Sequence, residues 1–161
     1  MLEETYTINT ETLALIPSIN KKYETVVIEN DKILFVKQTP LEIIEHTLYQ
    51  QWTTYEGRRK VVMHYTSYQR RVPIPIDIIN HIVAIPTHTE RDENCKWIIY
   101  SQIANFFTGS NDEETIIVFK NDQHMKLDIS SINLRKQCDR AMTCIAFTAL
   151  TSMHETFALK T

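Results

Sequence analysis

A cluster of basic residues carries the most evident chemistry in this sequence. Five cations lie between residues 53 and 72: Arg58, Arg59, Lys60, Arg70 and Arg71. Glu56 is the single carboxylate there, so five positive charges and one negative give this segment +4 in a chain whose net charge is -3. Cations beside the free N–H groups of a helix start suit phosphate oxygens. The cluster therefore indicates either a nucleic-acid contact or a solvated basic surface.

Aromatic residues surround this basic segment: Tyr49, Trp52, Tyr55, Tyr65 and Tyr68. Aromatic rings beside Arg and Lys are compatible with nucleic-acid binding, and they are equally compatible with packing in a core. The sequence leaves both interpretations open.

Other chemistries find little support. Only two glycines, Gly57 and Gly109, are present, too few for a P-loop or a dinucleotide-binding loop. His81, His88 and Cys95 have no metal-ligand spacing, and no nucleophile elbow occurs. We therefore expect no enzymatic activity, no metal site and no cofactor.

Composition predicts one globular domain over residues 1–161. The chain has 43% hydrophobic and 23% charged residues, which is ordinary globular usage. The acidic N-terminus is followed by no apolar run, so we expect neither secretion nor a membrane-spanning segment. Three cysteines without CxxC spacing predict reduced thiols, two of them on a buried helix face.

The N-terminal third predicts strands followed by a helix. Four short runs of alternating polarity predict an antiparallel meander: residues 6–8, 12–16, 25–28 and 33–36. Thr39, Pro40 and Glu42 form a capping box with proline at the first helical position, which predicts a helix from residue 40. Apolar spacing through Leu48 to Trp52 predicts that this helix buries one face and ends near Trp52.

The basic segment itself is ambiguous. Thr53 to Glu56 repeats the capping-box spacing, which would start a second helix with Val61, Val62 and Tyr65 inward. The same residues are β-formers, so helix and strand have equal support over residues 57–66. The two prolines of Val72–Ile76 predict an extended segment, either an edge strand or an ordered crossing.

The remaining chain predicts strands and a long helix. Strands are expected at residues 82–85 and 97–103, and a hairpin at 115–119 and 125–129. A final helix should run from Ser130 or Ser131 to about Leu150. Its predicted core stripe is Leu134, Cys138, Ala141, Ile145 and Ala149, with Lys136, Arg140 and Thr143 on another face. The fold class is thus α+β: antiparallel strands, two short central helices and a longer C-terminal helix.

Five motifs follow one another without insertion between residues 40 and 98. They are Pro40-Leu41-Glu42-Ile43, Thr53-Thr54-Tyr55-Glu56-Gly57-Arg58-Arg59, Arg70-Arg71-Val72-Pro73-Ile74, Pro86-Thr87 and Cys95-Lys96-Trp97-Ile98. This combination resembles the bacterial competence transcription factor family, ComK. The flanking elements also resemble the family in order and length.

The resemblance implies a cytoplasmic, nucleoid-associated activator of genes for DNA uptake. It implies dimers, or dimers of dimers, at paired A/T-rich boxes read through the minor groove, where Arg and Lys meet an enhanced negative potential. On this basis we expect DNA contacts from Tyr55, Gly57, Arg58, Arg59, Lys60, Arg70, Arg71, Lys136 and Arg140. RNA polymerase and an adaptor of the Clp protease machinery are further implied partners. Familiar members extend beyond the last helix, so DNA binding is implied more directly than promoter activation.

Two other classes of function stay open. The chain could be a shortened, non-catalytic interaction module that binds a full-length activator or its degradation adaptor. A hydrolase or nuclease would need paired carboxylates at a metal, whereas the acidic residues at 90–93 and 112–114 are typical of solvated loops.

The last helix is also a candidate for self-association. Its apolar face is wider than one core stripe needs: Ile132, Met142, Phe147 and Leu150. These side chains either bind a second copy or complete the monomer core.

Overall fold

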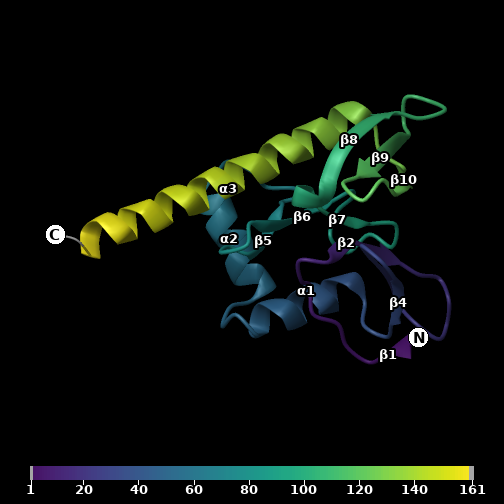
Figure 1. The fold of residues 1–161 in the computed structure, drawn as a ribbon, viewed down its shortest axis with the longest axis horizontal. Coiled ribbons are helices and arrows are strands. Elements are labelled where there is room, and N and C mark those ends of the chain that lie inside the picture. The colour runs from purple at the N-terminus through teal and green to yellow at the C-terminus, as the bar shows by residue number, and fades with distance from the viewer. Residues whose placement is uncertain (1, 160–161) are drawn as a thin grey trace.

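A seven-stranded sheet forms the centre of the molecule. The computed structural model describes the backbone of residues 2–159 and the side chains of residues 2–150. In spatial order the strands are β1 (Leu2–Glu3), β4 (Ile33–Val36), β3 (Thr25–Glu29), β2 (Thr12–Pro17), β7 (Trp97–Ile99), β6 (Ile82–Pro86) and β5 (Ile74–Asp77). The proline-rich strand β5 lies at the edge, which is one of the two arrangements predicted for it. Together with three helices, the sheet confirms the α+β class (Figure 1).

The expected strand at residues 6–8 is wrong. The amides of this segment donate to side chains: Tyr6 N to Gln38 Oε1 and Ile8 N to Thr47 Oγ1, both at 3.0 Å. These bonds hold the segment against the helix side of the sheet. The first strand is instead β1, which pairs in parallel with β4, while β2, β3 and β4 form the expected antiparallel meander.

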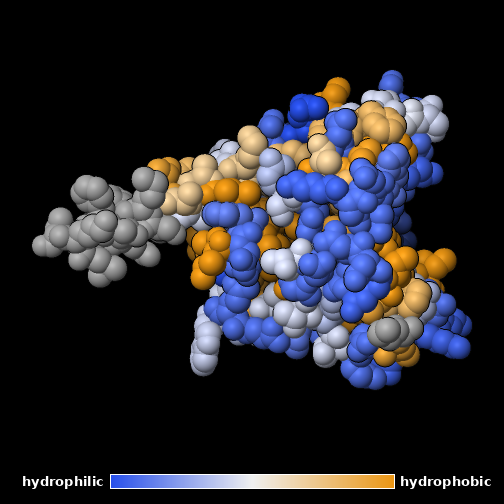
Figure 2. Space-filling view, in the orientation of Figure 1, coloured by the Kyte–Doolittle hydropathy of each residue, from blue (hydrophilic) through white to orange (hydrophobic). Residues whose placement is uncertain are grey.

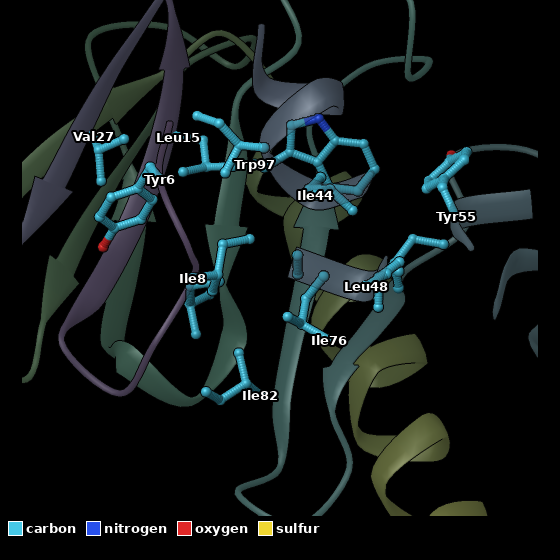
Figure 3. Packing of buried hydrophobic residues seen from close by; sticks show 14 of the residues in the cluster. Tyr6, Ile8, Leu15, Val27, Ile44, Leu48, Tyr55, Ile76, Ile82 and Trp97 are labelled. Carbon is cyan, nitrogen blue, oxygen red and sulfur yellow. The ribbon is translucent and has the colours of Figure 1, made fainter. Parts of the chain in front are cut away.

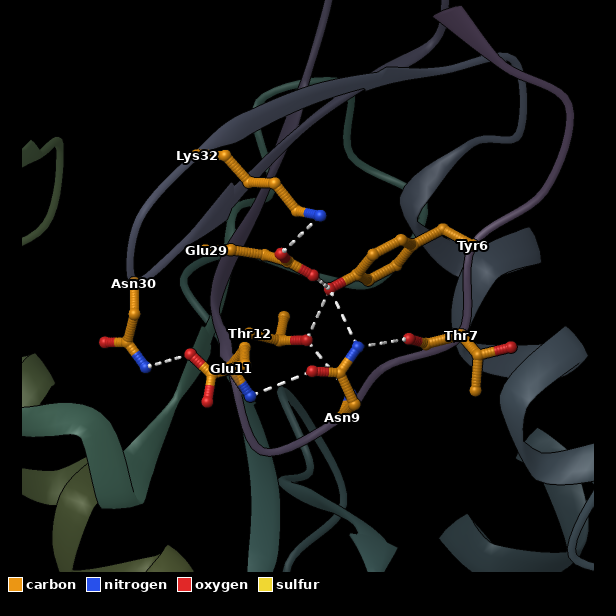
Figure 4. A network of polar contacts seen from close by, with 8 residues as sticks. All are labelled: Tyr6, Thr7, Asn9, Glu11, Thr12, Glu29, Asn30 and Lys32. Carbon is orange, nitrogen blue, oxygen red and sulfur yellow. Dashed lines mark hydrogen bonds and ion pairs between the residues drawn. The ribbon is translucent and has the colours of Figure 1, made fainter. Parts of the chain in front are cut away.

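The N-terminal segment is joined to the β2–β3 hairpin by a polar network (Figure 4). The Tyr6 hydroxyl donates to Glu29 Oε2 at 2.5 Å and lies 2.7 Å from Thr12 Oγ1. Lys32 Nζ lies 3.7 Å from the other oxygen of Glu29. A buried carboxylate is thereby given a hydrogen bond and a cation, which its burial requires.

A second sheet of three strands covers one face of the first. It contains β8 (Ile103–Thr108), β9 (Thr115–Phe119) and β10 (His124–Leu127), in the order β10-β9-β8. The predicted hairpin is β9–β10, and Asp122 adopts a positive φ of 71° in its turn. The predicted strand at 97–103 is interrupted by a 3₁₀ turn, η1 (Tyr100–Gln102), after which β8 joins the smaller sheet.

The first helix, α1 (Pro40–Tyr49), begins as predicted. The side chain of Thr39 accepts from Glu42 N, and the Glu42 side chain accepts from Thr39 N, which completes the capping box. The helix ends before Trp52, whose φ is 62° and whose side chain is 97% exposed. The expectation that Trp52 packs inward is therefore wrong.

The ambiguous segment is helical: α2 (Tyr55–Tyr65). Its N-cap is Thr54, whose hydroxyl accepts from Gly57 N at 2.8 Å. Val62 is buried, whereas Val61 and Tyr65, predicted to face inward, are 52% and 53% exposed. The cap and the burial of Val62 outweigh the β propensity of the segment.

The third helix, α3 (Ser131–Leu159), is longer than predicted. At 1.5 Å per residue it spans roughly 40 Å, and it crosses the molecule and projects beyond the body (Figure 1). Its buried side chains are Leu134, Gln137, Ala141 and Cys144. The buried stripe therefore differs from the predicted one. Of the residues predicted for it, Cys138, Ile145 and Ala149 are only partly buried in the structure.

Both faces of the large sheet are covered by side chains. On one face α1 and α2 pack against Leu15, Ile76 and Trp97, as Figure 3 shows in part. On the other face Ile85 and Ile98 pack against the smaller sheet and the first turns of α3. Strand β7 is buried on both faces, so the sheet is a rigid support for α2 and α3.

Candidate nucleic-acid interface

The loop between α2 and β5 is held by side chains from two helices. Three successive carbonyl oxygens of this loop each accept a hydrogen bond. Arg59 Nη2 of α2 donates to Gln69 O at 3.2 Å, and Arg140 Nη1 of α3 donates to Arg70 O at 2.8 Å. Gln137 Nε2, also of α3, donates to Arg71 O at 2.9 Å. The loop end of the basic segment is thus bonded both to α2 and to the last helix.

Gln137 is the central support of this arrangement. It is 6% exposed, and its Nε2 also donates to Pro86 O of β6 at 2.9 Å. Its Oε1 accepts from Arg140 Nη1 at 3.3 Å. One buried amide therefore links the loop, the sheet and α3.

Arg140 combines two roles. Its guanidinium carbon lies 4.4 Å from the centre of the Tyr68 ring, a cation–π contact. Its Nη1 donates to the loop, while its Nε is buried and has no hydrogen-bond partner among the described residues. The cation is thus positioned by packing as well as by hydrogen bonds.

We give the name basic ridge to six cations that come from α2, this loop and α3: Arg59, Lys60, Arg70, Arg71, Lys136 and Arg140. Lys60, Arg70 and Lys136 are exposed, whereas the other three are partly buried. Arg59 lies 4.0 Å from Glu56, a weak pair on the same helix. The ridge therefore draws its cations from three elements, which the hydrogen bonds of Arg59, Gln137 and Arg140 join.

Arg71 has a strained backbone. Its φ is 50°, in the left-handed region that residues with a Cβ rarely adopt and that costs about 1 kcal/mol or more. The hydrogen bond from Gln137 to its carbonyl holds this conformation. Such strain is concentrated at functional sites.

Arg58 does not belong to the ridge. Its Nη1 donates to Pro75 O of β5 at 2.9 Å. Burial lowers the pKa of this guanidinium, and the carboxylate of Asp77 opposes that effect. Arg58 therefore joins α2 to the edge strand.

Tyr55 and Gly57 also serve the fold. Tyr55 is 5% exposed and packs edge-on against Trp97, and burial raises the pKa of its hydroxyl far above the ordinary value. Its amide donates to Glu45 Oε2 at 2.6 Å, and the Gly57 amide donates to Thr54. A Cβ at Gly57 would lie 2.9 Å from Thr54 Oγ1, so the cap requires glycine there. Both amides therefore already have acceptors within the fold, and a DNA contact from either residue stays a prediction.

An apolar groove lies between α2, β5 and α3. Its volume is about 330 Å³, and its walls include Val61, Tyr65, Ile78 and Phe147. The rings of Tyr65 and Phe147 are 5.6 Å apart. Figure 2 shows hydrophobic residues gathered where α3 passes α2. The sequence indicated the apolar face of α3 but not that it continues onto α2.

Sequence reasoning missed Gln137 as the support of the loop. The signal was present, because Gln137 lies three residues after Leu134 and four before Ala141, both buried. A polar residue at core spacing in an amphipathic helix indicates a buried hydrogen-bonding role.

No three His, Cys, Asp or Glu side chains of the described residues are grouped to hold a metal ion. Cys95, Cys138 and Cys144 are free, and burial raises the pKa of each thiol to about 11. Within the described residues, no helix is sufficiently long and apolar to cross a membrane.

Comparison with known proteins gives one consistent result. The family model described as ComK protein matches residues 3–150. The chain is 28% identical over 138 residues to a protein named Competence transcription factor from Bacillus subtilis (strain 168), which covers 85% of this chain and 71% of that protein. No solved structure matches significantly.

Proposed function

Since the chain belongs to the ComK family, we propose that it is a transcription regulator that binds A/T-rich duplex DNA through the basic ridge. We propose that it regulates genes for DNA uptake. The name of its Bacillus subtilis relative, Competence transcription factor, supports this. Arg and Lys side chains entering a narrow minor groove would read its negative potential with few contacts to base edges.

The observation that carries this proposal is the support of the loop from two helices. Hydrogen bonds from Arg59, Gln137 and Arg140 fix three successive carbonyls. Arg70 is therefore presented from a fixed backbone, which lowers the entropy lost on binding. A merely solvated basic surface needs no such support.

Charge also directs the binding. The remaining chain is acidic, so phosphates are repelled from other faces and attracted to the ridge. This asymmetry supports one DNA-binding face rather than general adhesion to polyanions.

We further propose that two copies associate through the apolar groove and the adjacent face of α3. Tyr65 and Leu150 are 53% and 60% exposed, and large apolar patches on a monomer mark interaction sites. A two-fold pair would place two ridges side by side, which suits paired boxes. RNA polymerase and a Clp adaptor remain proposed partners of the regulator.

A change on α3 tests the association. Leu150→Glu is expected to yield a folded monomer that binds one box and loses cooperative binding to two. Ile19→Glu, at a fully exposed loop position, is the matched control. Light scattering coupled to size exclusion decides the matter: a wild-type monomer both free and on paired boxes would contradict this interface.

A fluorescence anisotropy titration tests DNA binding itself. We expect tighter binding to an A/T-rich duplex than to a G/C-rich duplex of equal length, with or without magnesium, and no cleavage. Binding to neither duplex would favour the interaction module, and magnesium-dependent cleavage would favour a nuclease.

A further inference from the structure

A second pocket lies on another part of the molecule, where β2 ends, α1 begins and the loop before β7 passes. Its volume is about 300 Å³. Pro17, Pro40, Leu41 and Trp97 form apolar walls. None of the ridge cations lines it, so it is separate from the proposed DNA-binding face.

The indole nitrogen of Trp97 is a buried donor without an acceptor. Trp97 is 0% exposed, and its Nε1 has no hydrogen-bond partner among the described residues. In Figure 3 this nitrogen lies on the side of the ring turned away from Ile76 and Ile82, and Trp97 is one of the residues that line the pocket. An unpaired buried N–H on a side chain that lines a pocket points to an oxygen that a ligand would supply.

The rim of the pocket is acidic. Glu24, Glu90, Asp92 and Glu93 line it, and Arg91 is the one cation among its lining residues. Among the described residues, none of these four carboxylates has an ion-pair partner within 4.0 Å. Burial is the main cause of the raised pKa of both Tyr55 and Cys95, and the negative charge of Glu90 raises both further.

We propose that this acidic pocket binds a short basic peptide segment of a partner protein. One backbone carbonyl of the peptide accepts from Trp97 Nε1, and an adjacent Arg or Lys side chain pairs with the carboxylates of the rim. The apolar walls bury the peptide's aliphatic stems. The rim side chains rotate aside to admit the carbonyl.

The chemistry selects a peptide over other ligands. A nucleic acid or another polyanion is repelled by the rim. A polyamine supplies positive charge but has no acceptor for the indole N–H. A basic peptide supplies both groups at adjacent positions.

The two tryptophans allow a direct test by ¹⁵N–¹H correlation spectroscopy of the full chain. The exposed Trp52 and the buried Trp97 each give one indole signal, which Trp52→Phe assigns. The probe is a blocked pentapeptide of alternating alanine and arginine. We expect a saturable downfield shift of the Trp97 signal and none at Trp52.

Two matched comparisons sharpen the test. The double variant Glu90→Gln/Glu93→Gln should bind the peptide about tenfold more weakly, whereas Glu113→Gln, on a distant exposed loop, should bind it like the wild type. The same peptide with citrulline in place of arginine should leave the Trp97 signal unmoved. The Glu90→Gln/Glu93→Gln variant should keep full DNA affinity, so the result is independent of the proposed DNA binding.

Three outcomes would overturn the proposal. One is a Trp97 signal that does not shift with millimolar peptide, which would mean that the pocket holds only water. Another is an equal response to the citrulline peptide. The third is an equal response to spermidine, which would make the pocket a site for free cations.

Discussion

Arg58 and Arg59 are adjacent in the chain but belong to two different regions. Arg58 lies in the seam between α2 and β5, where it donates to Pro75 O and is partly desolvated. Arg59 supports the loop of the basic ridge, whose exposed cations Lys60, Arg70 and Lys136 are accessible to a ligand. In the seam the positive charge of Arg58 joins two elements of the fold, whereas in the ridge three cations are exposed to solvent. The comparison shows that local charge density alone does not tell which part of the fold a cation contacts.

The largest effect is expected where the fold supports the ridge. Gln137→Ala removes the donor to Arg71 O and to Pro86 O, which leaves two carbonyls without a partner and costs about 2 to 4 kcal/mol of unfolding free energy. DNA affinity should fall as well, because the loop loses its support. Urea unfolding and anisotropy measure the two effects.

Lys136→Ala, one residue earlier on the same helix, is the control for this variant. It should leave the urea midpoint unchanged. A Gln137→Ala protein with wild-type stability and wild-type affinity would show that the loop does not need this support.

The seam should respond differently from the ridge. Arg58→Ala removes a charged hydrogen bond and a packed aliphatic stem, at a cost of about 2 kcal/mol of unfolding free energy. The affinity of the folded variant for DNA should change little. If Arg58→Ala weakened DNA binding as strongly as Arg70→Ala without loss of stability, the assignment of Arg58 to the seam would be wrong.

Within the ridge we expect the opposite result: a loss of DNA affinity with little loss of stability. Arg70→Ala keeps the carbonyl that accepts from Arg140 and removes only an exposed cation. We expect a loss of about 1 to 2 kcal/mol in DNA binding and less than about 0.5 kcal/mol in stability.

Arg91→Ala is the matched control, since Arg91 is an exposed arginine outside the ridge. Its DNA affinity should equal that of the wild type in the same anisotropy titration. An equal loss in both variants would indicate that total charge, rather than the ridge, determines binding.

Local signals allowed much of the fold to be predicted. The capping box at Thr39 and Glu42, the hairpin around Asp122 and the extended form of the proline-rich segment were all readable. Such features depend on neighbours in the chain. Trp52 was predicted wrongly because the helix stops three residues before it, and a hydrophobic side chain beyond a helix end is not tied to the helix period.

The site was less predictable because its geometry depends on distant partners. The guanidinium of Arg58 donates to Pro75 O, whereas the guanidinium of Arg59 donates to Gln69 O. The residues around Arg58 and Arg59 in the sequence do not show this difference. The contribution of Arg140 and Gln137 requires α3 to cross the loop 66 to 70 residues away in sequence. The charge pattern therefore located the ridge but could not separate it from the seam.

The salt dependence of DNA binding tests the basic ridge most directly. Each phosphate contact contributes about 0.9 to the slope of log affinity against log salt concentration. The triple variant Lys60→Ala/Arg70→Ala/Lys136→Ala should therefore reduce the slope by up to about 3 on an A/T-rich duplex. It should unfold at the same urea concentration as the wild type. An unchanged slope in this folded variant would contradict the account.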